Sequence, residues 1–138
     1  MSRVVTWLTL LACASCSAEA AEPMPDCVEL SPACSPLYPP TFDEVFVRTL
    51  VPTCGQAEGA CHSADKKRGG LAFSSDDPDG AHAALLEKGR LRPGDPACSE
   101  LVVRTHRAGH PWSMPPKTPL SAQEACALRL WVEAGALR

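Results

Sequence analysis

Two cysteines and a histidine form the most chemically suggestive group in this sequence. Residues 53–63 read TCGQAEGACHS, so Cys61 directly precedes His62, and six residues separate Cys54 from Cys61. Covalent haem attachment uses two thiols and an imidazole in the pattern Cys-x-x-Cys-His. There the thiols add to the two haem vinyl groups and the imidazole binds the iron. The longer spacing found here also fits a simple Cys54–Cys61 disulfide loop beside a surface histidine.

A haem iron that transfers electrons commonly takes a methionine thioether as its second axial ligand. Met1 would be lost with an export signal and Met24 lies in a proline-rich segment, so Met114 is the only methionine in the expected folded domain. Its loop, AGHPWSMPPKTP, is too rich in proline for a regular element and could hold the side chain rigidly. His106 and His110 flank this loop and are alternative ligands. A core filler is the commoner role of a lone methionine.

The N-terminal residues are typical of an export signal, which we place at residues 1–20. The short apolar run VVTWLTLLA follows Arg3 and is too short to span a membrane. Cys13 follows a small residue, as in a bacterial lipobox, so we predict that it is lipidated and anchors the chain to a membrane. Lipidation at Cys16, or cleavage after Ala20 with release of the chain, are the alternatives.

The other cysteines favour an oxidising compartment. Eight cysteines in 138 residues are too many for a reducing one unless a cofactor consumes thiols. Residues 21–40 form a linker that holds six prolines and is therefore extended and semi-rigid. We expect Cys27 and Cys34 to close a small loop within it. We also expect a Cys98–Cys126 disulfide that fastens the Met114 loop between two helices.

The remaining residues, 41–138, predict one all-α domain of about four short helices with long Pro/Gly-rich loops. Thr41 and Glu44 form a capping box for a first helix that Pro52 should stop. Asp77-Pro78 should open a second helix that Gly89 closes. The third should begin at Asp95-Pro96, and the fourth should run from Ser121, with a capping box to Glu124, to Gly135. Such a small, loop-rich bundle needs disulfides or a cofactor for stability.

The order of the motifs resembles the planctomycete/myxobacterial type of small c-type cytochrome domain. In that family a helix leads to Cys-(x)n-Cys-His, followed by Gly-Gly-Leu, Pro-Gly-Asp-Pro with Ser-x-Leu, Met-Pro-Pro, and a last helix ending in Trp-(Ile/Val)-x-x-Gly-Ala. The corresponding residues here are VFVRTLVPTC, Cys61-His62, Gly69-Gly70-Leu71, Pro93-Gly94-Asp95-Pro96 with Ser99 and Leu101, Met114-Pro115-Pro116, and Trp131-Val132 with Gly135-Ala136. The resemblance covers about residues 41–136.

What the resemblance implies is one covalent haem c, attached at Cys54 and Cys61, with His62 as proximal and Met114 as distal ligand of the iron. We therefore expect an exported, periplasmic and membrane-anchored cytochrome-like protein that passes single electrons to a redox partner. The alternative is a haem-free lipoprotein of the same fold, held by disulfides and acting as a binding or structural module. The sequence lacks the common catalytic motifs, so we do not expect an enzyme. The net charge of −3 does not favour nucleic-acid binding.

Overall fold

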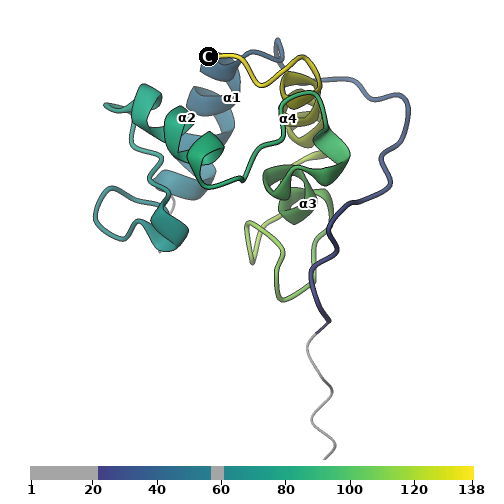
Figure 1. Cartoon of the computed structure of the whole chain (residues 1–138), viewed down its shortest axis with the longest axis horizontal. Coiled ribbons are helices and arrows are strands. Elements are labelled where there is room, and N and C mark those ends of the chain that lie inside the picture. Colours follow the sequence, from purple (N-terminus) through teal and green to yellow (C-terminus); the bar gives the residue numbers. More distant parts are fainter. Residues whose placement is uncertain (1–21, 57–60) are drawn as a thin grey trace, which may run out of the picture.

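The computed structural model describes residues 22–56 and 61–138 (Figure 1). Within these ranges it contains four α-helices and no strand, which confirms the all-α prediction. The elements are α1 (Phe42–Val45), η1 (Phe46–Gly55), η2 (Arg68–Gly70), α2 (Pro78–Glu87), η3 (Pro96–Cys98), α3 (Glu100–His106) and α4 (Ala122–Glu133). No helix in the described part of the chain is both long and apolar enough to cross a bilayer. The predicted export signal, including Cys13, lies outside these residues.

The first helix buries the face that its sequence predicts. The Thr41 hydroxyl accepts a hydrogen bond from the Glu44 amide at 3.4 Å, while the Glu44 carboxylate pairs with Arg48 one turn later. Five buried residues follow the spacing i, i+3, i+4, i+7 and i+8 that places side chains on one face of a helix; they are Phe42, Val45, Phe46, Thr49 and Leu50. Thr41 therefore caps this helix, and its buried face anchors it in the core.

The prediction that Pro52 stops this helix is wrong. The chain continues through Pro52 as the π-helix η1, which ends at Gly55. In an α-helix a proline ring clashes with the carbonyl four residues earlier, but the wider π-turn moves that carbonyl away. The Gln56 amide accordingly donates to the Val51 carbonyl, five residues back, at 2.8 Å. Cys54 thus lies on the last turn of a helix and not in a loop.

The second and fourth helices begin where their caps predict. The Asp77 carboxylate accepts from the Gly80 amide at 2.9 Å at the start of α2. Both halves of the predicted capping box are present at the start of α4, between Ser121 and Glu124. Gly135 follows α4 with a φ of 105°, a conformation that favours glycine and ends the helix.

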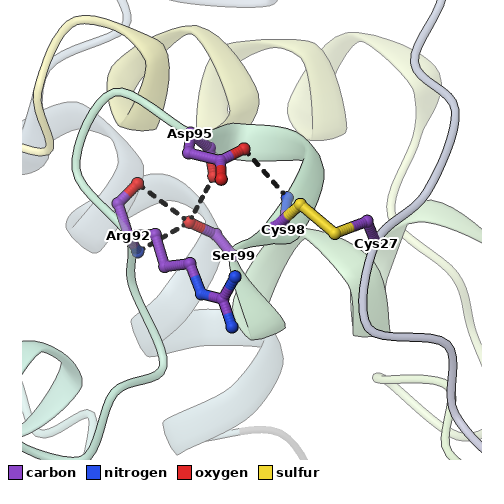
Figure 2. The surroundings of a disulfide bond; sticks show 5 residues. All are labelled: Cys27, Arg92, Asp95, Cys98 and Ser99. Carbon is purple, nitrogen blue, oxygen red and sulfur yellow. Dashed lines mark hydrogen bonds between the residues drawn. A yellow bond between two sulfur atoms is a disulfide. The ribbon is translucent and has the colours of Figure 1, made fainter.

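The third helix begins later than predicted. Asp95-Pro96 opens only the single turn η3, where the Asp95 carboxylate accepts from the Cys98 amide at 3.2 Å. The backbone then becomes extended at Ser99, and α3 starts at Glu100. The cause is the buried Ser99 hydroxyl, which bonds to the backbone of Arg92 and Asp95 and so holds a bend between η3 and α3 (Figure 2).

Both predicted disulfides are wrong, although the same four cysteines are paired. Cys27 bonds to Cys98, and Cys34 bonds to Cys126. The segment between Cys27 and Cys34 contains no helix or strand, and seven extended residues span roughly 23 Å, too far for a local bridge. Instead the N-terminal segment passes along α3 and α4 toward α1 (Figure 1), and each of its cysteines meets a cysteine of the helical part.

We call residues 22–40 the strap. Besides the disulfides, the strap is held by hydrogen bonds from Val28 to the Ala97 carbonyl (2.9 Å) and from Leu37 to the Gln123 carbonyl (3.2 Å). At its end the buried Tyr38 hydroxyl bonds to the Thr49 hydroxyl of η1. The strap is therefore packed on the helices along much of its length.

Candidate functional site

Cys54 and His62 are held together by the backbone. The His62 amide donates to the Cys54 carbonyl at 3.3 Å, although eight positions separate the two residues. In an α-helical turn, an amide bonds to the carbonyl four residues earlier. In a contiguous Cys-x-x-Cys-His on such a turn, the histidine amide would meet the carbonyl of the first cysteine. The structure makes this same pairing despite the longer spacing.

Phe73 fixes the position of His62 from the other side. The Phe73 amide donates to the His62 carbonyl at 2.8 Å, and the two rings meet edge to face with centroids 5.5 Å apart. Gly55 allows this approach, because a Cβ at Gly55 would overlap the Phe73 carbonyl oxygen. The Cys61 carbonyl accepts from the Arg68 amide at 2.9 Å. Cys54, Cys61 and His62 are thus brought together, as the sequence predicts.

Cys54 carries a free thiol that packs, partly buried, against the core. The Cys54–Cys61 disulfide considered from the sequence is therefore absent from the structure. Burial raises the pKa of the Cys54 thiol to about 11, since the charged thiolate is poorly solvated there. At neutral pH Cys54 is an uncharged thiol next to the histidine loop.

His62 is half-buried and carries a neutral imidazole at neutral pH. Burial lowers the pKa of His62, and the positive charges of Arg104 and Arg68 lower it further, against the opposing effect of backbone groups of Arg68 and Leu71. Its Nδ1 atom is buried and has no hydrogen-bond partner among the residues that the structure describes. A neutral imidazole is the form that binds metal ions.

Met114 lies in the loop between α3 and α4, fastened to the end of α3. Its amide donates to the Arg104 carbonyl at 2.8 Å, and the Arg104 guanidinium donates to the Trp112 carbonyl at 3.0 Å. Met114 itself is half-buried. In Figure 1 this loop and the loop between η1 and η2 lie at the same end of the molecule, opposite the C-terminus. The structure thus supports the expected rigid loop around Met114.

Trp112 and Arg104 are site residues that the sequence analysis missed. Trp112 is 9% exposed, and its indole N–H has no partner within the described ranges. Among described residues, the only other buried side-chain nitrogen or oxygen without a partner is His62 Nδ1. A tryptophan in a proline-rich loop gives no sequence signal for an unsatisfied donor, because burial and partners depend on the tertiary structure.

The two alternative ligands near Met114 are both half-buried. The His110 ring stacks on Trp112 with centroids 4.5 Å apart, and its Nδ1 lies 2.8 Å from the Glu22 carboxylate. Burial lowers the pKa of His106, and Arg107 and Arg129 lower it further. His110 is therefore already engaged by the strap and by Trp112.

The hollows and the metal-ligating side chains of the described residues do not add a binding site around Cys54, His62 and Met114. Of two hollows of about 240 Å³ each, neither is lined by Cys54, His62 or Met114, although Trp112 and His110 line the first together with the strap. In residues 22–56 and 61–138, no three His, Cys, Asp or Glu side chains are grouped to hold a metal ion. The candidate site therefore consists of the Cys54 thiol at the end of η1, the Cys61 thiol and His62 imidazole of the loop that follows, and the Met114 thioether of the second loop.

Comparison with protein families places part of this chain in a known group. Residues 59–118 match the family described as Planctomycete cytochrome C. The matched segment includes Cys61, His62 and Met114 and begins after Cys54. No curated protein and no solved structure matches the chain. The family match supports a planctomycete-type cytochrome c domain and confirms the resemblance stated from the sequence.

Proposed function

We propose that this planctomycete-type cytochrome c domain carries one covalently bound haem and transfers single electrons. Cys54 and Cys61 would hold the haem through thioethers, each formed when an S–H adds across a vinyl group. His62 and Met114 would be the axial ligands. When bound, the haem supplies an iron that alternates between two oxidation states, one electron apart. Electron transfer alone converts no substrate, so we do not propose an enzyme.

The observation that carries this proposal is the hydrogen bond from the His62 amide to the Cys54 carbonyl. The spacing from Cys54 to Cys61 exceeds that of Cys-x-x-Cys-His by four residues. The bond nevertheless brings the start and end of the motif together as a single helical turn would. The extra residues therefore lengthen the loop without separating Cys54 from His62.

The chemistry of the residues fits a haem as well. The group offers two sulfur nucleophiles, a neutral imidazole and a thioether, which are the donors that a c-type haem uses. The two unpartnered buried nitrogens, His62 Nδ1 and Trp112 Nε1, lie on the two loops that this proposal brings to the haem. Buried polar atoms without partners cost about 1–3 kcal/mol each, so each of these two nitrogens favours the presence of a bound group at its loop.

We propose that the protein acts outside the cytoplasm, in the periplasm, anchored to a membrane by a lipid on Cys13. Its two disulfides support this location, because such bonds persist in oxidising compartments. A redox partner protein would deliver or accept the electron.

The second candidate is a haem-free module of the same fold. It is favoured by the packing of Cys54 against the core and by its raised pKa, which keeps the thiol in its least nucleophilic form. In this case the two disulfides alone would hold the fold, and the domain would serve binding or structure.

The test is expression in a host that matures c-type cytochromes. We expect an intense Soret band and a mass increase of one haem on the chain. Cys61→Ser and Cys54→Ser should each leave at most one thioether, and Met114→Ala should lower the reduction potential and change the reduced spectrum. An unmodified mass, with both Cys54 and Cys61 open to alkylation, would contradict haem binding and favour the second candidate. An unchanged spectrum in Met114→Ala would point to His106, His110 or water as the ligand.

A further inference from the structure

Arg104 connects the end of α3 to the Met114 loop at two points. Its backbone carbonyl accepts from the Met114 amide at 2.8 Å, and its guanidinium donates to the Trp112 carbonyl at 3.0 Å. The two bonds hold the loop on both sides of Ser113, which is itself buried. The Arg104 backbone therefore holds the Met114 amide and its side chain holds the Trp112 carbonyl, so loss of the side chain should loosen the loop next to Met114.

Glu100 fixes the Arg104 side chain from within α3. Its carboxylate accepts from the Arg104 Nε at 2.6 Å and also pairs with Arg90. Burial raises the pKa of Glu100, but the hydrogen bonds from Arg90 and Arg104 outweigh this effect and the net shift is downward. Arg90, Glu100 and Arg104 thus form a cluster of two cations and one anion, with a net charge of +1. Each of the three side chains is one-third exposed or less.

The charge of Arg104 also bears on His62. Arg104 is one of the two cations whose charge lowers the pKa of His62, after the larger effect of burial.

We infer that Arg104 is a positioning residue that fixes the Met114 loop on the end of α3 and keeps a positive charge on the Met114 side of the proposed haem. This inference rests on the proposed function for its role in electron transfer, although the positioning of the loop does not require a haem. A positive charge near the iron favours the reduced state, which carries one positive charge fewer. Arg104 should therefore raise the reduction potential in addition to ordering Met114.

The experiment compares three variants of the full chain by amide hydrogen exchange and by potentiometry. Arg104→Met removes the charge and the donors, while Arg104→Lys keeps the charge but cannot donate to Glu100 and Trp112 in the same planar geometry. Arg92→Met is the matched control, because the Arg92 guanidinium forms no ion pair or hydrogen bond within the described part of the chain. Hydrogen exchange is measured whether or not the chain carries haem.

We expect exchange of the Met114 amide to become about tenfold faster in Arg104→Met, with a smaller increase in Arg104→Lys. The Ala81 and Leu85 amides of α2 should exchange as in the parent protein. If haem is attached, the potential should fall in Arg104→Met and change less in Arg104→Lys. Equal exchange at Met114 in all three variants, or an equal increase at Met114 and throughout α2, would overturn the inference.

The outcomes separate this inference from the proposed function. A chain that acquires no haem but shows selective loss of protection at Met114 would refute the proposed function and retain the positioning role. The reverse outcome is a chain that acquires haem but whose Met114 exchange and reduction potential do not change in Arg104→Met. That result would retain the proposed function and refute the positioning role.

Discussion

Cys54 illustrates how burial changes the chemistry of one residue. Its thiol packs against the core at the end of η1, and burial raises its pKa to about 11. At pH 8 only about one thiol in a thousand would then be ionised. The proposed attachment of haem at Cys54 would therefore have to begin from a protonated thiol or before the helix has packed.

We predict that alkylation of Cys54 by iodoacetamide, in protein without haem, accelerates about tenfold per pH unit from pH 7 to pH 10. The reason is that only the thiolate reacts, and its fraction rises tenfold per unit below the pKa. Mass spectrometry of the peptide that carries Cys54 measures the rate. A plateau near pH 9, as for an exposed small thiol, would contradict the raised pKa.

Gly55 is the second residue on which the site depends. We predict that Gly55→Ala destabilises the protein by about 3 kcal/mol, because the added Cβ would overlap the Phe73 backbone, which cannot move like a flexible side chain. Gly80→Ala is the comparison, since there the Cβ meets only the Asp77 side chain that caps α2. Its loss should therefore be at most that of a cap, about 1 kcal/mol, and the alanine gained by the helix partly offsets it. Urea unfolding measures both. Similar small losses in the two variants would show that Phe73 can move away.

At the scale of elements, local signals predicted the helices whose ends are controlled by neighbouring side chains. Asp77 and Ser121 cap α2 and α4 as expected, since a cap needs only a residue within one turn. The end of η1 and the start of α3 were not predicted. The first depends on a π-turn around Pro52, and the second on the buried hydroxyl of Ser99, and neither is visible in periodicity.

Ser99 carries the bend between η3 and α3. Its hydroxyl accepts from the Arg92 amide at 2.7 Å and lies 2.9 Å from the Asp95 carbonyl (Figure 2). We predict that Ser99→Ala destabilises the protein by about 2 kcal/mol, since it leaves a buried amide without a partner. Ser31→Ala, on the exposed strap, should change stability by less than about 0.5 kcal/mol. Chemical denaturation with an unchanged m-value measures the stability of both variants. If Ser99→Ala is as stable as the parent protein, water replaces the hydroxyl.

For the whole molecule, the sequence predicted the residues of the candidate site better than the disulfide pairing. Cys54, Cys61 and His62 are close in sequence, and the backbone brings them together. The strap cysteines pair with residues 71 and 92 positions away, which no local pattern specifies. Proline made the strap extended, as predicted, but its attachment to α4 and η3 depends on the packing of the complete fold.

The disulfide pairing can be checked directly. Residues 4–47 contain no lysine or arginine, so trypsin leaves Cys27 and Cys34 on one peptide that ends at Arg48. Cys98 and Cys126 fall on two others, 91–104 and 118–129. We predict that an unreduced digest contains one species in which all three peptides are linked. Two separate species, one peptide with an internal bond and the other two peptides joined together, would instead support the pairing of Cys27 with Cys34 and of Cys98 with Cys126.

The two disulfides of the strap should contribute strongly to the stability of so small a domain. Cys27–Cys98 closes a separation of 71 residues, and removing it should destabilise the protein by about 4 kcal/mol, because the unfolded chain gains the entropy that the cross-link had removed. We predict this loss for the paired variant Cys27→Ser with Cys98→Ser, measured by thermal and urea unfolding. Both positions are accessible enough that serine introduces no buried polar group, unlike a change at Cys126, which is 3% exposed.

Because Cys34–Cys126 stays intact in this variant, the strap should remain attached at α4, and only its first half should become sensitive to protease. An unchanged melting temperature would mean that the packing of the helices holds the strap without this bond.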